Sequence, residues 1–182
     1  MIYSGNLISK WQVPDKLVEV FGLIRQGRPD AYFLILTPER HRELVEPHLK
    51  RAGIAPEDYG IYSCPHVEVV RYLCAADVAL LLRKRHPANE VAAPGKFSEC
   101  MLTGLSIIMT EGIGEFSDQV RDTEFACVLP GLDGLQAMQG RIQEFCARNR
   151  SSEQRLAQGR WAAQRVSTDL SMPQLAALYQ GL

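Results

Sequence analysis

APGKFSECMLTGLSIIMTEGIG, residues 93–114, predicts a helix, a buried strand and a glycine turn in quick succession. Phe97, Met101 and Leu102 have the spacing of one helix face, and Gly104 is the residue type that ends a helix in the left-handed conformation. The run LSIIMT that follows is short, continuous and rich in isoleucine, which is typical of a strand buried in a parallel sheet. The stretch therefore predicts half of a βαβ unit.

The chain on either side of this stretch continues the alternation of strands and helices. Helices are predicted to begin at Pro14, Pro38 and Pro65, because proline favours the first turn of a helix. The polar segment 84–94 has no period and is predicted to be a surface loop. Strands are predicted at residues 1–3, 31–37, 59–63, 77–83 and 125–129, and further helices at 116–121, 132–148 and 152–166 and after Pro173.

This alternation predicts an α/β fold: a Rossmann-like parallel sheet with helices on both faces and a helical tail at the carboxyl end. In such sheets ligands bind beyond the carboxyl ends of the strands, where the strand order reverses. Four loops are therefore expected on one rim, at residues 5–10, 63–66, 83–96 and 111–115. These loops are the candidate binding site.

Length and composition favour a single domain over residues 1–182. The formal net charge of −1 supplies no basic field, so nucleic acid is not an expected partner. The five cysteines are scattered without a C-x-x-C pair, which argues against a disulfide framework or a zinc site and favours a reducing cytoplasm. Because the longest apolar runs are far shorter than the roughly 20 residues that cross a bilayer, any membrane association is expected to be peripheral.

Charged side chains near helix starts and strand ends are candidates for binding phosphate. Lys10 follows the first glycine turn, and Lys96 lies beside a helix start whose free N–H groups also attract anions. Arg83 ends a very apolar strand, which favours either an anion or a structural carboxylate as its partner. Glu99 lies in the first turn of a helix, where the dipole stabilises it with or without a ligand. A solvated surface position remains the alternative for both lysines and for His66.

Several common active-site motifs are absent from the sequence. It has neither a G-x-x-x-x-G-K-[ST] loop nor a G-x-G-x-x-G after the first strand, so a P-loop enzyme and an ordinary dinucleotide dehydrogenase lose their main support. A D-x-D pair for a divalent metal and a G-x-S-x-G nucleophile elbow are also missing. No metal site is predicted.

Three segments together resemble a known family: YSGNLISKW near the start, ADVALLLR in the middle, and NEVAAPGKFSECMLTGLSIIMT. They are similar to the carboxyl-terminal half of bacterial retaining glycosyltransferases of family 4, the group 1 glycosyltransferases, whose sugar-polymer members read approximately P-x-K-x-x-E-Y-x-A-x-G-L-P-V-I. The resemblance covers nearly the whole chain, including the tail at 161–182. These enzymes have the GT-B architecture, in which an acceptor domain and a carboxyl-terminal donor domain face a cleft.

The resemblance implies that this chain is the donor-binding half of such an enzyme, with a nucleotide sugar as its partner and neither cofactor nor metal. Lys10 matches a basic residue that neutralises the donor diphosphate, and Glu99 matches an acidic residue that hydrogen-bonds the ribose hydroxyls. Residues 94–97 match the segment whose backbone approaches the phosphates, and residues 63–66 match the region that frames the base. The candidate donor-binding residues are Gly5, Asn6, Lys10, Cys64, His66, Glu90, Gly95, Lys96, Phe97 and Glu99, and the candidate catalytic residues are Lys10 and Arg83.

The sequence departs from the family pattern at three places. Many members carry a first glutamate at the position of Val91, and here Glu90 lies one residue away. Cys100 stands where an aromatic residue is common, and Ala126 stands where a glycine is usual. The role of the first glutamate is therefore either absent or taken by Glu90 after a shift of the loop.

The resemblance also implies that an acceptor domain is absent from this chain. We expect a piece of a longer protein or a subunit that needs a partner chain, with any membrane contact made through the full-length protein. Alone, the chain is expected to bind the donor weakly and turn over poorly, because the cleft that orients the acceptor is incomplete. A sugar-nucleotide epimerase half and a non-catalytic partner subunit remain alternatives, since fold alone does not separate them.

Overall fold

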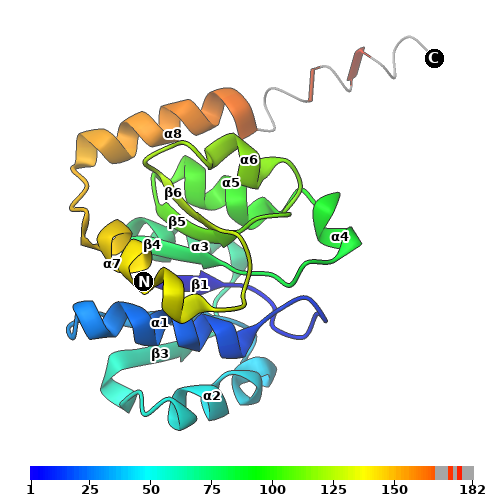
Figure 1. The fold of residues 1–182 in the computed structure, drawn as a ribbon. Coiled ribbons are helices and arrows are strands. Elements are labelled where there is room, and N and C mark those ends of the chain that lie inside the picture. Colours follow the sequence, from blue (N-terminus) through cyan, green and yellow to red (C-terminus); the bar gives the residue numbers. More distant parts are fainter. Residues whose placement is uncertain (167–171, 174–175, 178–182) are drawn as a thin grey trace.

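The computed structural model describes residues 1–166, 172–173 and 176–177. At its centre is a six-stranded parallel sheet with the strand order β3-β2-β1-β4-β5-β6 (Figure 1). The strands are β1 (Ile2–Ser4), β2 (Phe33–Leu36), β3 (Tyr59–Tyr62), β4 (Val78–Leu81), β5 (Ser106–Thr110) and β6 (Ala126–Leu129). The chain runs outward from β1 to β3, returns to place β4 beside β1, and then runs outward to β6. The strand order therefore reverses between β1 and β4.

Helices connect the strands and cover both faces of the sheet (Figure 1). The α-helices are α1 (Pro14–Gly27), α2 (Glu46–Arg51), α3 (His66–Ala75), α4 (Pro87–Glu90), α5 (Gly95–Leu102), α6 (Phe116–Val120), α7 (Gln139–Ala147) and α8 (Ser152–Val166). The 3₁₀-helices are η1 (Glu39–Leu44), η2 (Pro56–Asp58) and η3 (Leu135–Met138). Among the described residues, no helix is long and apolar enough to cross a membrane.

Two hydrophobic layers share the sheet. Side chains of α1, α2 and α7 bury one face, with Phe21, Leu49 and Phe145 among them. Side chains of α3, α5 and α8 bury the other face. Because side chains alternate along each strand, Ile108 of β5 belongs to the first layer and Ile107 to the second. This two-sided burial explains the continuous apolar runs from which the strands were predicted.

The predicted fold class is confirmed, and several boundaries agree with the sequence. Helix α1 has the predicted ends, and helix α8 begins at the predicted residue. Gly104 has φ +69°, its N–H donates to the Met101 carbonyl at 3.1 Å, and the Leu105 N–H donates to the Cys100 carbonyl at 2.9 Å. These two bonds form the Schellman motif that ends α5, so Gly104 is the predicted helix terminator.

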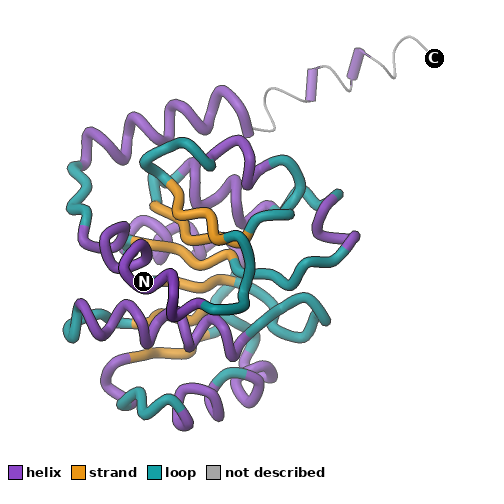
Figure 2. Tube along the Cα trace, in the orientation of Figure 1, coloured by secondary structure: helices purple, strands orange, loops and turns teal. Residues whose placement is uncertain are grey.

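Other predicted boundaries are wrong, each for a local reason. The single helix predicted after Pro38 is two, η1 and α2, because Pro47 lacks the N–H that an uninterrupted helix needs and lies in the first turn of α2. The predicted loop at 84–94 contains the one-turn helix α4 (Figure 2). Pro87 begins this helix, and the His86 Nδ1 caps it by accepting from the Ala88 N–H. The predicted helix 132–148 begins only at η3.

The predicted inward face of α5 also needs correction. Leu102 is 42% exposed, whereas Cys100 is buried beside Phe97 and Met101. Residues 97, 100 and 101 have the i, i+3, i+4 spacing, and a free cysteine packs as a small hydrophobic residue. The helix predicted after Pro173 falls largely outside the described residues, as does most of the tail that resembles the glycosyltransferases.

Candidate functional site

The parallel sheet brings the carboxyl ends of its six strands to one edge, and the strand order reverses there between β1 and β4. Gly5 follows β1 directly, and Arg83 lies two residues beyond the end of β4. A crevice at such a reversal is where open α/β sheets bind ligands. The rim of four predicted loops is therefore in the expected place.

Hydrogen bonds tie the loops of this rim to one another. The Lys84 N–H, after β4, donates to the Trp11 carbonyl, after β1, at 2.9 Å. The Gly114 N–H, after β5, donates to the Asn89 carbonyl at 2.8 Å. The Asn89 side chain is only 1% exposed and donates to the Lys84 carbonyl at 2.8 Å. These bonds hold the loops after β1, β4 and β5 as one rim.

Lys96 reaches from the first turn of α5 to the reversal point. Its Nζ occupies the space in which a Cβ on residue 5 would lie, and Gly5 has φ +139°, a conformation that favours glycine. The ammonium lies 5.1 Å from the centroid of the Tyr3 ring. Within the described part of the chain, the Lys96 side chain forms no hydrogen bond or ion pair. This half-buried cation lies at the strand-order reversal, and no carboxylate of the described residues forms an ion pair with it.

The surroundings of Lys96 change its proton affinity. Burial, and secondarily the nearby Arg83 guanidinium, lower the pKa of Lys96 to about 8. A bound anion would reverse both effects by supplying an opposite charge. Contact with a phosphate would therefore stabilise the charged form of Lys96.

The first turn of α5 adds backbone donors to the same place. Its N-terminus has no side-chain cap, so the N–H groups of Gly95 and Lys96 have no partner among the described residues. The Phe97 N–H is already used, because it donates to the Pro94 carbonyl at 2.9 Å. The Phe97 side chain is buried against Phe116, with ring centroids 4.6 Å apart. Phe97 thus shapes the helix start from inside the core and offers no free group to a ligand.

Glu99 and His66 meet across the rim. The His66 Nε2 and the Glu99 Oε1 lie 2.9 Å apart, although the two residues are 33 positions apart in sequence. Glu99 lies on α5, three residues after Lys96, and His66 is the exposed first residue of α3. A carboxylate at this place accepts hydrogen bonds from hydroxyl or imidazole groups. The predicted loop 63–66 is thereby joined to α5.

Three other predicted residues form no hydrogen bond or ion pair with Lys96 or Glu99 in the described part of the chain. Lys10 lies in an exposed turn before α1. The Asn6 Oδ1 accepts from the Ile8 N–H at 2.7 Å and so stabilises its own loop. The half-buried Cys64 thiol has a pKa raised by burial, which keeps it protonated. Lys96 is the cation that the structure places beside Gly5.

Arg83 and Glu90 lie in the loop after β4. The Arg83 Nη1 donates to the Asn89 Oδ1 at 3.0 Å, whereas its Nε is buried without a partner among the described residues. Burial lowers the pKa of Arg83. Glu90 ends α4 and lies 3.6 Å from Arg85, and the neighbouring Val91 is 86% exposed. Arg83 therefore belongs to the Lys96 cluster, whereas Glu90 is paired away from it.

A cavity of about 640 Å³ opens beside Arg83, between the loops after β4, β5 and β6 and the start of α1. Thr110 lies at its edge: its Oγ1 accepts from the Arg83 N–H and donates to the Arg83 carbonyl, both at 3.1 Å. The loop 130–133, after β6, also lines this cavity. Neither Thr110 nor this loop was predicted as part of the site, although a polar residue ending an apolar strand is a signal for the carboxyl edge.

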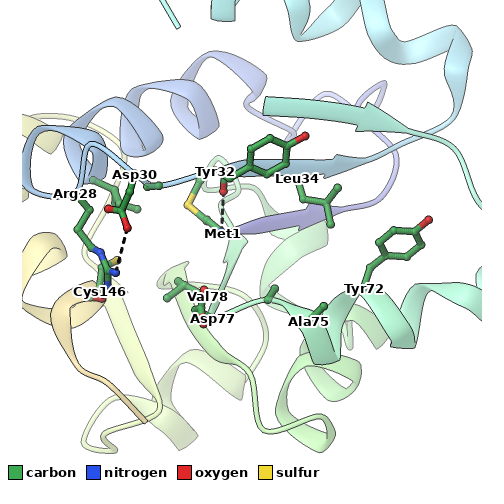
Figure 3. Close-up of a pocket in the computed structure, with 13 residues that line it drawn as sticks. Met1, Arg28, Asp30, Tyr32, Leu34, Tyr72, Ala75, Asp77, Val78 and Cys146 are labelled. Carbon is green, nitrogen blue, oxygen red and sulfur yellow. Dashed lines mark hydrogen bonds and ion pairs between the residues drawn. The ribbon is translucent and has the colours of Figure 1, made fainter. Parts of the chain in front are cut away.

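A second cavity, of about 310 Å³, lies at the opposite, amino edge of the sheet (Figure 3). It extends from Tyr72 of α3 to Arg28 and Cys146, near the ends of α1 and α7. None of the predicted site residues lines it. In the described part of the chain, no group of three or more His, Cys, Asp or Glu side chains is arranged to hold a metal ion.

No protein-family model and no curated protein matches the sequence. Solved structures do match. The pneumococcal O-GlcNAc transferase GtfA, solved in complex with UDP and GlcNAc, superposes with a TM-score of 0.73 at 14% identity, over 98% of this chain and 35% of that chain. WaaG, a glycosyltransferase of lipopolysaccharide biosynthesis, superposes with a TM-score of 0.65 at 17% identity, over 97% of this chain and 45% of that chain.

This chain spans less than half the length of those two glycosyltransferases. It also matches an isolated carboxyl-terminal domain, that of the glycosyl transferase group 1 family protein LpcC from Francisella tularensis. That domain superposes with a TM-score of 0.64 at 15% identity, over 91% of this chain and 84% of that chain. This chain therefore has the fold of the Rossmann-like carboxyl-terminal domain of GT-B glycosyltransferases.

Proposed function

We propose that this chain binds the nucleoside-diphosphate sugar for a glycosyltransferase and forms the donor half of its active site. The observation that carries the proposal is the half-buried Lys96 ammonium at the strand-order reversal, which forms no ion pair with a carboxylate of the described residues and lies beside two α5 amides that those residues leave unpaired. GtfA, which has the same fold in this region, was solved with UDP. A diphosphate is the ligand whose charge these cations and amides would match.

Different residues of the proposed site contact the diphosphate and the ribose. Lys96, Arg83 and the amides of Gly95 and Lys96 neutralise the diphosphate, which makes it a better leaving group. Glu99 accepts hydrogen bonds from the ribose hydroxyls after His66 moves aside. This neutralisation uses side chains and amides of the chain itself, so the proposed transfer is metal-independent.

The sugar would pass to a polysaccharide or glycolipid acceptor held by a second domain or a partner chain. That part of the proposal rests on the resemblance to family 4 and on the share of the full-length enzymes that this chain spans. Because the acceptor site is then supplied from across the cleft, this chain alone would bind nucleotide with little transfer.

Calorimetric titration with UDP and GDP tests the proposal. We expect saturable binding of one nucleotide, weakened roughly tenfold or more by Lys96→Met and by Glu99→Gln, since each removes a charge-assisted hydrogen bond of about 1.5–3 kcal/mol. Lys10→Ala should weaken binding less, because Lys10 lies outside the cluster. Lys50→Met, on exposed α2, is the matched control and should leave affinity unchanged. Absence of binding at millimolar nucleotide would refute the proposal.

A further inference from the structure

A third cavity, of about 260 Å³, lies at the amino edge of the sheet, below β4 and β5. It adjoins the cavity of Figure 3, with which it shares Arg28, Asp77 and Cys146. Four arginines and a single carboxylate line it: Arg28, Arg148, Arg150, Arg155 and Asp77. This strong excess of positive charge has no role in the proposed donor site, which lies at the opposite edge.

Arg150 is the most constrained of the four. Its Nη1 donates to the Ser106 Oγ at 3.2 Å and to the Gln158 side-chain oxygen, and its Nη2 donates to the Gln154 carbonyl at 3.1 Å. Its Nε is buried with no hydrogen-bond partner in the described part of the chain. Neutral oxygens therefore fix the guanidinium in place, and no carboxylate of the described residues forms an ion pair with it, although Glu124 is near enough to act on its charge.

The other arginines are also incompletely paired. Arg155 donates from Nη2 to the Cys74 carbonyl at 3.2 Å, and no carboxylate of the described residues forms an ion pair with it. Arg28 lies 3.8 Å from an exposed Asp30, a distance at the limit of an ion pair. Arg148 pairs with Glu144 at 3.2 Å, and both side chains are at least half exposed. Such exposed pairs compensate little charge.

Two further features favour an anion here. Helix α8 begins two residues after Arg150, so the positive end of its dipole lies next to the cavity. The Cys146 thiol in the wall has a pKa raised to about 12, chiefly by burial, and therefore adds no negative charge. Asp77 is the one acidic group in the lining.

We propose that this arginine-lined cavity at the amino edge is a binding site for a phosphate group, either inorganic phosphate or the phosphomonoester end of a larger molecule. Arginine forks match phosphate oxygens with paired hydrogen bonds, and several forks together suit a dianion better than a carboxylate. The cavity of about 260 Å³ has room for a phosphate group and its hydration water within reach of the arginines. The site is separate from the nucleotide site and does not depend on it.

Arginine-detected and amide NMR of the whole chain tests this site. On titration with millimolar inorganic phosphate, against sodium chloride at equal ionic strength, we expect saturable shifts of the Arg150 and Arg155 Nε signals and of the amides around residue 149. Arg155→Gln and Arg28→Gln should each weaken this binding roughly tenfold, since each removes a charge-assisted contact. Arg51→Gln, on exposed α2, is the matched control and should have no effect. Arg150 itself is left intact because it secures the start of α8.

Two additional arms separate the ligand sources and the two sites. Co-sedimentation with phosphatidylcholine vesicles, with and without phosphatidic acid, tests whether the chain binds a lipid phosphomonoester. Sedimentation that requires both phosphatidic acid and Arg155 would identify a lipid as the source of the phosphate group. NMR shifts with inorganic phosphate, without such sedimentation, would identify a soluble source. Lys96→Met should leave both unchanged, because it alters only the nucleotide site. Absence of saturable shifts and of phosphatidic-acid-dependent sedimentation would overturn the proposal, as would binding that is insensitive to both arginine variants.

Discussion

At the scale of single residues, the half-buried Lys96 side chain carries its charge in partly desolvated surroundings. The lowered pKa of about 8 reflects that burial and the repulsion of Arg83. A phosphate bound beside it would be an opposite charge, so the ammonium must be protonated in the complex. Nucleotide affinity is therefore linked to pH through this one residue.

We predict that UDP or GDP affinity is nearly constant up to about pH 7 and falls about tenfold per pH unit above about pH 8, because the free protein must then take up a proton to bind. Calorimetry in buffers of different ionisation enthalpy measures both the affinity and that proton uptake. Lys96→Met should bind weakly with no such pH dependence. An equally steep fall in this variant would assign the effect to another group.

Folding stability depends on Lys96 with a defined sign. The pKa of Lys96 is lower in the folded protein than its ordinary value of 10.5, so the unfolded chain binds more protons between about pH 8 and that value. Stability therefore rises with pH through this window, and Lys96→Met should remove that rise. Urea midpoints of both proteins at about pH 7 and about pH 10 give the comparison.

The sequence predicted the rim but not the contacts within it. Parallel strands have their carboxyl ends at one edge, so the loops holding Gly5, Lys96 and Glu99 could be assigned to that edge from order alone. The packing of α5 and α3 over β1 and β4 decides which lysine lies beside Gly5. It also decides whether His66 reaches Glu99. Those are long-range contacts, and a single sequence does not encode them locally.

At the scale of the elements, helices α5 and α8 approach each other through glycines. A Cβ on Gly159 would lie 2.9 Å from the Leu102 carbonyl oxygen, and one on Gly104 would overlap the Arg155 carbonyl. Backbone against backbone leaves no flexible side chain to move aside. The two helices therefore pack at a distance that only glycine permits.

We predict that Gly159→Ala destabilises the protein by about 1–3 kcal/mol, because α8 must move away from α5 to accept the methyl group. Gly22→Ala is the matched control: Gly22 lies inside α1 with no atom within 4 Å of its would-be Cβ, so this change should stabilise by about 0.5–1 kcal/mol. Urea denaturation measures both. Equal effects of the two substitutions would mean that the close approach of α5 and α8 is not what limits residue 159.

The elements that the sequence placed well are those whose signals are local. Pro14 with an apolar face of α1, and Gly104 at the end of α5, each act within a few residues. The predicted helix and loop boundaries were wrong where a second local signal interrupted or started a helix. Pro47 splits the helix predicted after Pro38, and α4 forms in a segment without hydrophobic period because Pro87 and the His86 side chain start it.

At the scale of the whole molecule, one sheet is shared by two hydrophobic layers. Alternate residues of the same strand belong to opposite layers, as Ile107 and Ile108 do. Loss of either layer exposes one face of every strand. The two layers should therefore unfold together, as expected of a single domain of this size.

The two tryptophans allow this coupling to be measured from opposite parts of the molecule. Trp11 stacks on His86 at the carboxyl rim, and Trp161 of α8 packs against Phe125, each pair with centroids 5.6 Å apart. In each single-tryptophan variant, Trp11→Phe and Trp161→Phe, we predict that fluorescence and far-UV circular dichroism give coincident urea curves. Nucleotide at about 100 times its Kd should raise the free energy of unfolding by about 2.7 kcal/mol in both variants, because ligand bound at the rim stabilises the entire cooperative unit. If nucleotide shifted the unfolding curve followed by Trp11 but not the curve followed by Trp161, α8 and its layer would unfold independently of the rim. Nucleotide binding at the rim would then not stabilise the amino edge of the sheet.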